Sequence, residues 1–586
     1  QKFNETKKWN CTTLEELYDK IEDRKEANKI VNSIKICDPA VGSGHFLVSA
    51  LNEMIAVKND LKILQDREGK RLKEYQVEVV NDELIVTDEE GELFEYNPSN
   101  KESQRIQETL FHEKQTIIEN CLFGVDINSN SVKICRLRLW IELLKNAYYK
   151  NATELETLPN IDINIKCGNS LVSRFAIDAD LKQALKKSKW SIDSYQIAVD
   201  TYRNAESKEQ KREMERLIAD IKSDFRSEIS LNDPKVKKLR KLSGDLFQMT
   251  NQGQLFEMSK KEKADWNKKV TQLTEETKKL ETEIEEIKAN KIFENAFEWR
   301  FEFPEVLNDD GDFVGFDVVI GNPPYLSYYS RESVGIDTNF EDYLHSHFAF
   351  LNGYSKKVRK NSLMIFLELG MRLLHQKSVL IYICDLNLLE KPSIPIRQFI
   401  HNNFNIVEVI SNLNVFEDVA SGQVIIALEN DKQNDNIYRH KSNSFTDYKN
   451  VNQSLINEPD YSFVPALENS ILAKIDISPL RLQDFFDIKV GMNIGGVKER
   501  FLHAENNNNQ YYKFINGGDN VQRWKITFPT EKQIRKGQTY VDFNKTIEKE
   551  IWDNKIGTPS IGETNDRFIN HKVIIRQSDT KLSSVL

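Results

Sequence analysis

Short β-branched runs alternate with segments of helical periodicity in the first third of the chain. The run Val31–Cys37 predicts a strand, and the glycine turn Asp38–Gly44 follows it directly. Behind the turn, apolar pairs three to four residues apart predict a helix over Phe46–Ile55. Leu122–Asp126 predicts another strand, followed by a helix with apolar residues at helical spacing: Val132, Cys135, Leu139 and Leu143. Strand, glycine turn and helix in this order are typical of a doubly wound α/β sheet.

Polar stretches interrupt this alternation twice. Residues 60–118 are polar and acidic, with a hairpin predicted around Thr87–Leu93, and are expected to be an insertion. Alternation over Ile161–Cys167 then predicts a further strand, which ends in the sequence GNSL. Residues 180–300 are rich in Lys, Glu and Gln and predict a long helical hairpin inserted into the sheet. The evidence for this hairpin is a heptad seam: Trp266, Val270, Leu273, Thr277, Leu280, Ile284 and Ile287.

The α/β pattern resumes after the hairpin. Phe316–Ile320 predicts a buried strand that runs into GNPPY, and Leu363–Leu374 predicts a helix. Three further strands are expected at Val379–Cys384, Ile406–Ile410 and Val424–Leu428. We therefore expect a single α/β domain over residues 1–465. Residues 466–586 have short, glycine-punctuated runs and many aromatic residues, which predict a smaller β-rich or α+β domain, expected to be incomplete.

Composition narrows the class of protein. Hydrophobic residues make up 39% and charged residues 29% of the 586, as in ordinary globular chains. The longest apolar runs fall far short of the roughly 18 residues that a membrane span needs, so no contact with a membrane is expected. The six cysteines are scattered without a CxxC pair, which predicts neither a disulfide framework nor a metal site and favours a reducing cytoplasm.

The net charge of -10 is unevenly distributed. Residues 481–586 carry 17 Lys and Arg against 13 Asp and Glu, whereas residues 1–480 carry 64 against 78. The C-terminal part is therefore the electropositive one, a mild asymmetry that either a nucleic-acid partner or an ordinary surface would explain.

The first candidate site is the turn Asp38-Pro39-Ala40-Val41-Gly42-Ser43-Gly44. Glycines here allow a sharp turn and a close approach of the backbone to a ligand. A dinucleotide fingerprint would place a third glycine where this chain has Leu47, which argues against a bound pyrophosphate. Asp126 ends the next predicted strand, where a carboxylate either accepts the two hydroxyls of a ribose or caps the following helix.

Asn322-Pro323-Pro324-Tyr325 is the most specific feature of the chain. Two consecutive prolines fix the backbone and leave carbonyl groups free to accept hydrogen bonds. The Asn322 amide oxygen and one such carbonyl can accept both hydrogens of an exocyclic amine. The Tyr325 ring offers a face on which a base can stack.

In this order, DPAVGSGHF, VD, GNSL and GNPPY resemble the motifs of the amino-methyltransferases of DNA. The glycine motif precedes NPPY, as in a group of N6-adenine methyltransferases, and RFEFPEV and NVFEDVASGQVII extend the likeness over residues 30–430. A Tyr/Phe-Thr-Pro stretch that the family has before the glycine turn is not visible here. The combination with a C-terminal domain resembles large single-chain type IIG restriction-modification enzymes.

The resemblance implies a Rossmann-like, S-adenosylmethionine-dependent methyltransferase sheet and a DNA-recognition domain over residues 466–586. It assigns a methyl-donor site to Asp38, Pro39, Ala40, Gly42, Gly44, Asp126 and Asn169, the last standing where the family usually has Asp. It places Asn322, Pro323, Pro324 and Tyr325 at the transferring centre. Phe416 would be a second aromatic residue against a base flipped out of double-stranded DNA, or else an ordinary core residue.

Two alternatives stay open. The first is methylation of the N4 amine of cytosine, which can be held by the same hydrogen-bond acceptors. A Ser in place of Asn322 would favour this alternative. A DNA-specificity subunit with a degenerate methyltransferase fold is the second. No nuclease core is recognised in the sequence, so we expect this chain to methylate, and any restriction nuclease to lie in another segment or subunit.

Overall fold

The computed structural model describes two parts of the chain. In the first, residues 1–464 are described except 152, 161–162, 178–185, 206, 233, 252–259, 290, 329–337, 356–359 and 414–421. Beyond them the described stretches are 498–505, 512–513, 521–522, 525–526, 529–536, 538, 540–541, 549–551, 553, 574–575 and 584–585. Internal contacts divide the chain into two units, Gln1–Pro465 and Ala466–Leu586.

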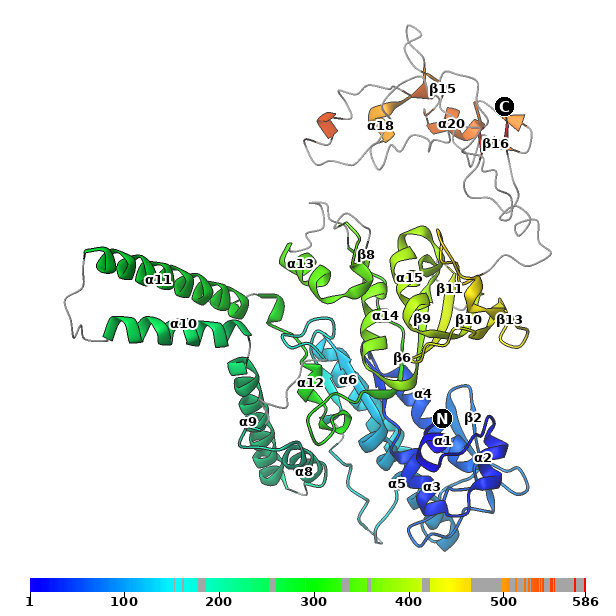
Figure 1. Cartoon of the computed structure of the whole chain (residues 1–586). Coiled ribbons are helices and arrows are strands. Elements are labelled where there is room, and N and C mark those ends of the chain that lie inside the picture. Colours follow the sequence, from blue (N-terminus) through cyan, green and yellow to red (C-terminus); the bar gives the residue numbers. More distant parts are fainter. Residues whose placement is uncertain are drawn as a thin grey trace. The chain divides into compact units, whose positions relative to one another are not determined.

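A nine-stranded sheet forms the centre of the first unit (Figure 1). Its order is β13-β12-β10-β11-β9-β6-β1-β4-β5. The strands are β1 Ile36–Asp38, β4 Leu122–Asp126, β5 Ile165–Cys167, β6 Phe316–Gly321, β9 Leu374–Asp385, β10 Asn405–Leu413, β11 Gln423–Glu429, β12 Ile437–Ser442 and β13 Lys449–Asn452. The five from β5 to β9 are parallel, and β11 is antiparallel to both of its neighbours. The predicted doubly wound α/β sheet is confirmed.

The chain reverses its winding direction at β1. It passes from β1 to β4 and β5 on one side, then returns to place β6 on the other side of β1. The carboxyl ends of these four parallel strands therefore meet at one edge, hereafter the carboxyl edge. In open α/β sheets a ligand crevice lies at such a reversal point.

Helices cover both faces of the sheet because successive strand residues point to opposite sides. Ile36 belongs to one buried cluster and its neighbour Cys37 to the other. The covering helices include α4 His45–Asp60, α5 Lys101–Cys121, α6 Ser129–Leu144, α14 Ser362–Arg372 and α15 Ile394–Asn403. Further α-helices in the described residues of this unit, outside the arm, are α1 Lys2–Lys7, α2 Leu14–Lys20, α3 Arg24–Asn32, α12 Trp299–Glu302 and α13 Thr338–His347.

The structure corrects two sequence predictions near the N-terminus. Val31 lies in the last turn of helix α3 instead of starting a strand, because Ala27, Ile30 and Val31 lie on the buried face of that helix. Residues 60–118 are only partly an insertion. The hairpin of β2 Tyr75–Val80 and β3 Glu83–Asp88 is one, and a tighter turn follows with Thr87 bridged to Leu93. Residues 101–118 instead belong to α5, a covering helix with one buried face.

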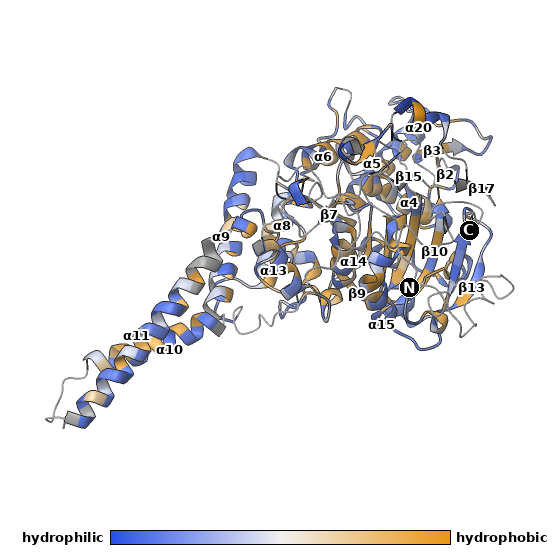
Figure 2. Ribbon diagram, turned by 90° about the horizontal axis from the view of Figure 1, so that it is seen from above, coloured by the Kyte–Doolittle hydropathy of each residue, from blue (hydrophilic) through white to orange (hydrophobic). Residues whose placement is uncertain are grey.

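The predicted helical hairpin is confirmed and lies between β5 and β6. We call the whole segment the arm: α8 Ile192–Arg203, α9 Lys208–Asn232, α10 Pro234–Asn251 and α11 Lys260–Ala289. Helices α10 and α11 run antiparallel (Figure 1). The described seam residues of α11 are buried or half-buried, from Trp266 to Ile284, while most positions between them are exposed. In the ribbon of Figure 2, orange, hydrophobic residues accordingly alternate with blue, hydrophilic ones along both helices.

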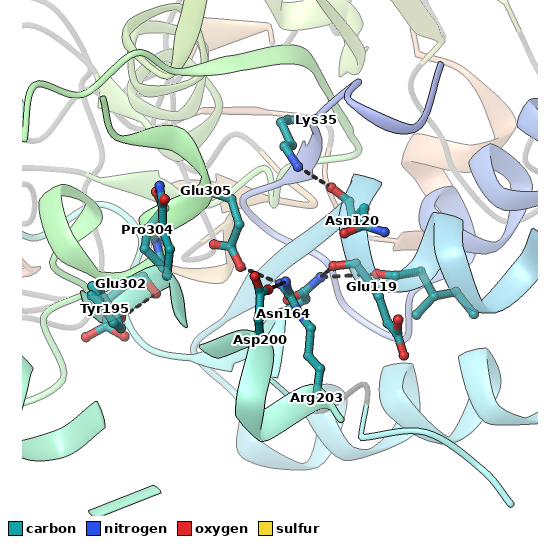
Figure 3. A network of polar contacts seen from close by, with 12 residues as sticks. Lys35, Glu119, Asn120, Asn164, Tyr195, Asp200, Arg203, Glu302, Pro304 and Glu305 are labelled. Carbon is teal, nitrogen blue, oxygen red and sulfur yellow. Dashed lines mark hydrogen bonds and ion pairs between the residues drawn. The ribbon is translucent and has the colours of Figure 1, made fainter. Parts of the chain in front are cut away.

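Ion pairs between largely buried acids and the cations around them, of which Arg226 is exposed, attach the arm to the sheet. Glu302 of α12 pairs with Lys166 of β5 at 3.5 Å, with Lys222 of α9 at 2.6 Å and with Arg226 of α9 at 3.2 Å. Arg203, at the end of α8, donates to Asn164 Oδ1 at 2.9 Å and pairs with Glu305 (Figure 3). We call these six charged residues the arm joint: Lys166, Arg203, Lys222, Arg226, Glu302 and Glu305.

Short elements complete the description. β7 Ser327–Tyr328 pairs with β8 Lys360–Asn361. In the second unit the strands are β14 Leu502–His503, β15 Tyr512–Lys513, β16 Val521–Gln522, β17 Lys525–Ile526, β18 Tyr540–Val541, β19 Ile574–Ile575 and β20 Ser584–Val585, with helices α18 Lys498–Phe501 and α20 Glu531–Lys536. None of the helices in the described residues combines the length and apolar character needed to span a bilayer.

Candidate functional site

The glycine turn carries the chain from β1 into α4 at the carboxyl edge. Gly42 and Gly44 have positive φ angles of 52° and 84°, a backbone region that side chains disfavour. A Cβ atom on Gly44 would lie 2.5 Å from Cys135 Sγ of α6, so only glycine fits there. The turn is therefore held tightly against α6, and the first N–H groups of α4 face the carboxyl edge without a side-chain cap.

Asp126 fixes the turn to the neighbouring strand. Its Oδ2 atom accepts the Gly42 N–H at 3.0 Å, and Oδ1 accepts the Asn128 N–H at 2.7 Å. The N-cap of α6 is Asn128, so the helix-capping alternative for Asp126 does not hold. The carboxylate is half-exposed, and each oxygen keeps a second acceptor position.

Asp38 is a buried carboxyl group with little compensation from the protein. Its side chain is only 1% exposed, and its Oδ1 accepts one backbone N–H, from Ala40 at 2.9 Å. Burial raises the pKa of Asp38 to about 7; the Ala40 N–H opposes this shift and the nearby Asp126 charge adds to it.

Gly321 connects the glycine turn to the NPPY segment. A Cβ atom at this position would lie 2.7 Å from Asp38 Oδ1, so the end of β6 approaches the Asp38 carboxyl too closely for any side chain. The next residue is Asn322. Asp38 and Gly321 are 283 positions apart in the sequence. The glycine turn and the NPPY segment thus meet at the β1–β6 reversal point.

The segment after β5 closes the other side of the turn. Ser170 is buried, and its hydroxyl donates to the Pro39 carbonyl at 2.6 Å. Asn169 is half-exposed; its Oδ1 accepts the Leu171 N–H at 3.1 Å and retains one acceptor position. Asn169 therefore lies beside the glycine turn with part of its amide unused.

The NPPY segment presents its first residue to solvent. Asn322 is exposed, Pro323 is buried and Pro324 is exposed. The Pro324 carbonyl accepts a hydrogen bond from the Ser362 hydroxyl, so the prediction that both proline carbonyls are free is wrong for Pro324. No hydrogen bond to the Pro323 carbonyl is recorded within the described residues. The Asn322 amide and the Pro323 carbonyl are the acceptors that remain.

Tyr325 is anchored through its hydroxyl. That group lies within hydrogen-bonding distance of Asn322 Oδ1 and of the Ile383 carbonyl of β9, the latter at 3.0 Å. Since a hydroxyl has one hydrogen, it donates to one of them at a time. Ser362, the first residue of α14, holds the following residue, because Leu326 N–H donates to its hydroxyl at 2.8 Å.

The structure thus brings most of the predicted site residues to the carboxyl edge: Asp38, Pro39, Ala40, Gly42, Gly44, Asp126, Asn169, Asn322, Pro323, Pro324 and Tyr325. Phe416 lies outside the described residues. Ser170 and Ser362, which tie two site loops to the frame, were not predicted. A serine directly after a strand or at a helix start is too common in sequences to reveal such a contact.

Comparison with known proteins places these features in a family. The family described as "Eco57I restriction-modification methylase" matches residues 120–416, slightly more than half of the chain. A curated protein of Methanocaldococcus jannaschii, named as a putative type II restriction enzyme and methyltransferase, is 28% identical over 348 residues. That match covers 54% of this chain and 25% of the relative, so the chain spans about a quarter of the relative's length.

Two solved structures are similar at low sequence identity. The type IIL restriction-modification enzyme MmeI in complex with DNA has 11% identity and a TM-score of 0.39; the match covers 93% of this chain and 53% of that one. The M protein of the type I restriction enzyme EcoKI has 9% identity and a TM-score of 0.26, covering 72% of this chain and 49% of that one.

Proposed function

Since the chain belongs to the Eco57I restriction-modification methylase family, we propose that it transfers a methyl group from S-adenosylmethionine to the N6 amine of adenine in double-stranded DNA. One observation carries the proposal: Gly321 lies against the buried Asp38 carboxyl, so the glycine turn and Asn322 lie next to each other at the carboxyl edge. A donor held by the turn and a base held by NPPY would meet there.

The residues of the turn fit S-adenosylmethionine. That molecule supplies an electrophilic methyl group on a positively charged sulfur, together with a ribose and an adenine. The buried Asp38 carboxyl suits a cationic ligand, since no protein cation is recorded beside it in the described residues. Asp126 keeps free acceptor positions for the two ribose hydroxyls, and Asn169 keeps one for the donor's adenine amine.

The NPPY segment fits an exocyclic amine. Asn322 Oδ1 and the Pro323 carbonyl would accept its two hydrogens and leave the nitrogen lone pair free for attack. The Tyr325 ring, and Phe416 by the family resemblance, would stack on the base. Stacking offsets part of the few kcal/mol that flipping a base out of the duplex costs.

Binding of the amine requires a small rearrangement. The Tyr325 hydroxyl, which lies beside Asn322 Oδ1, would turn its hydrogen to the Ile383 carbonyl. Asn322 would then be free to accept from the base, and Tyr325 would remain anchored to β9. This exchange costs little because both acceptors are already within reach.

The remaining parts of the proposal concern partners. Residues 466–586 would read the target sequence, with Lys and Arg on phosphates and polar side chains on base edges. A restriction nuclease, as part of a restriction-modification or phage-defence system, would lie in a segment or subunit outside this chain. We place the protein in the cytoplasm, where DNA is its substrate.

Modified-base sequencing of DNA tests the function. Methylation-free bacterial cells would express the chain or its Asn322→Ala variant. We expect N6-methyladenine at one recurring sequence with the parent chain and none with the variant. N4-methylcytosine would move the assignment to the cytosine alternative. No modification, from a folded chain that binds DNA, would favour a degenerate specificity subunit.

A further inference from the structure

Helix α10 of the arm concentrates positive charge in an acidic part of the chain. Five of its residues between positions 235 and 241 are basic, and Asp245 is its one acidic residue. Residues 1–480 as a whole carry 14 more acidic than basic side chains. The net charge of α10 is therefore positive, whereas that of residues 1–480 as a whole is negative.

Three of these cations share the outer face of α10. Val236, Leu239, Leu242, Leu246 and Met249 are half-buried and form the side that packs toward α11. Lys237, Arg240 and Lys241, spaced as i, i+3 and i+4, project from the opposite side and are exposed. No ion pair of these three is recorded in the described part of the chain. Lys238, on the flank, pairs with Glu276 of α11 at 2.7 Å.

The outer face of α11 has a different pattern. Lys261, Lys268 and Lys279 are exposed there, but Asp265 and Glu275 lie among them. Opposite charges on one helix face are typical of an ordinary solvated surface. The two helices of the hairpin thus provide a pair of faces for comparison. Three cations adjoin one another on α10, with Asp245 one turn beyond Lys241, whereas acidic residues lie between the cations on α11.

We propose that the outer face of α10, defined by Lys237, Arg240 and Lys241, binds the phosphate backbone of double-stranded DNA. The inference rests on the proposed function in taking DNA as the substrate, and adds a contact outside both the carboxyl edge and residues 466–586. The three cations lie within about 6 Å along the helix, and duplex DNA carries one negative charge per about 1.7 Å.

The chemistry of this face favours DNA over a protein partner. Continuing along it, the next exposed positions are Gly244 and Gln248. Phe247, 67% exposed, lies two turns beyond Arg240 at the edge of this face, and it is a single aromatic side chain beside three cations. Protein interfaces depend on buried aromatic or apolar anchors, whereas phosphates need only positive charge. The arm joint gives the helices a fixed base, since α9 is paired with Glu302 and also contacts α10.

The salt dependence of DNA binding tests the proposal. Full-length chain with Lys237, Arg240 and Lys241 all changed to Gln would be compared with a control in which Lys261, Lys268 and Lys279 are changed to Gln. Both variants lose three charges and keep good helix formers. Binding of a duplex without a target site would be titrated between 50 and 200 mM salt.

We expect the α10 variant to lower the slope of log affinity against log salt by up to about 3, with at least roughly tenfold weaker binding at 100 mM salt. The control should stay within about twofold. Equal losses in both variants, or no loss in either, would overturn the proposal. Methylation by the α10 variant at saturating DNA should persist, which separates this proposal from the proposed function. A parent chain that binds no duplex would overturn both.

A cross-link shows whether contact is direct. A Cβ on Gly244 meets nothing within 4 Å, so benzoylphenylalanine fits at this position. Gly244→benzoylphenylalanine should cross-link to duplex DNA under light, and Glu275→benzoylphenylalanine on α11 should not. The same yield at both positions would contradict a specific role of α10.

Discussion

The carboxyl edge and the arm joint each contain a largely buried acid, Asp38 and Glu302, but the pKa values of these two acids are shifted in opposite directions. At the arm joint, burial alone would raise the pKa of Glu302, yet the charges of Lys166, Lys222 and Arg226 lower it to about 2. At the carboxyl edge, burial raises the pKa of Asp38 to about 7, with one backbone N–H to oppose it. Cations of the protein compensate the charge of Glu302, whereas no such cation is recorded beside Asp38 in the described residues.

The difference separates a charge that serves the structure, Glu302, from a charge that would have its partner in a bound ligand, Asp38. The protein satisfies the arm joint internally, so its role ends with attaching the arm. Burying Asp38 without a cation costs stability, and such a cost is expected where function needs the group. Under the proposed function, the positively charged sulfur of S-adenosylmethionine would supply the cation that Asp38 lacks.

Removing the central acid of the arm joint should have the largest effect. Glu302→Gln leaves Lys166 with two like charges, Lys222 and Arg226, so the free energy of unfolding should fall by about 3–5 kcal/mol. Thermal unfolding measures this change, with Glu209→Gln on the exposed side of α9 as the control. Equal melting temperatures for both variants would show that the joint does not stabilise the arm.

The matching change at the carboxyl edge should have the opposite sign. An acid whose folded pKa is raised stabilises the fold at low pH, and that contribution is lost as pH rises through about 7. Asp38→Asn should therefore melt several degrees above the parent chain at pH 8.5, where the shift corresponds to roughly 4 kcal/mol. This advantage should shrink toward pH 5. A variant less stable at pH 8.5 than at pH 5, relative to the parent, would contradict the comparison.

For Glu302 the pH dependence should be reversed. Its lowered pKa makes its contribution full above about 4.5 and lost as pH falls toward 2. The stability difference between the parent and Glu302→Gln should therefore disappear in acid. Melting curves of all three proteins over one pH series would test both signs together.

A smaller effect is expected at Asp126. Asp126→Asn keeps one oxygen to accept the Gly42 N–H but removes the negative charge from a hydrogen bond to the ribose. The donor Kd should rise about fivefold, because charge-assisted hydrogen bonds exceed neutral ones by roughly 1 kcal/mol. Calorimetry with S-adenosylmethionine measures the Kd, and a melting temperature near that of the parent confirms the fold. An unchanged Kd would remove Asp126 from the donor site.

The smallest effect is expected for Tyr325→Phe, and comparing it with Tyr325→Ala separates the role of the hydroxyl from that of the ring. Tyr325→Phe loses only the hydroxyl that serves Asn322 and Ile383, so kcat/KM should change by less than about threefold. Tyr325→Ala also loses the stacking ring, and kcat/KM should fall roughly 10- to 100-fold, since stacking on a base contributes about 1–3 kcal/mol. Similar losses in both variants would mean that the hydroxyl itself binds the base.

Sequence patterns predicted the frame of the site because its strands are continuous apolar runs bounded by Gly, Asp or Asn. The strand predicted at Leu122–Asp126 has the observed bounds, and the one at Phe316–Ile320 ends one residue early. The sequence pattern predicts an insertion where helix α5 forms, since only one face of this polar helix is buried and the chain before it is acidic. The strand predicted to begin at Val31 is wrong for a related reason, because β-branched residues also occupy buried helix faces.

Local patterns could not predict the contacts that give the site its electrostatics. The burial of Asp38 depends on Gly321, which is distant in sequence, and on the order in which the strands assemble. The bond of Ser362 to Pro324 and the choice of partner for the Tyr325 hydroxyl depend on α14 and β9. Residue identities at strand ends were readable from sequence, and the distances between those ends were not.

One paired measurement on Asn322→Ala tests the central claim most directly. Calorimetry would give the Kd for S-adenosylmethionine, and transfer of a labelled methyl group to duplex DNA would give the rate. We predict a donor Kd within about twofold of the parent and a transfer rate at least a hundredfold lower, since a positioned acceptor in the reacting centre contributes about 3 kcal/mol. A variant that transfers methyl groups at the parental rate would contradict the claim that Asn322 holds the target amine.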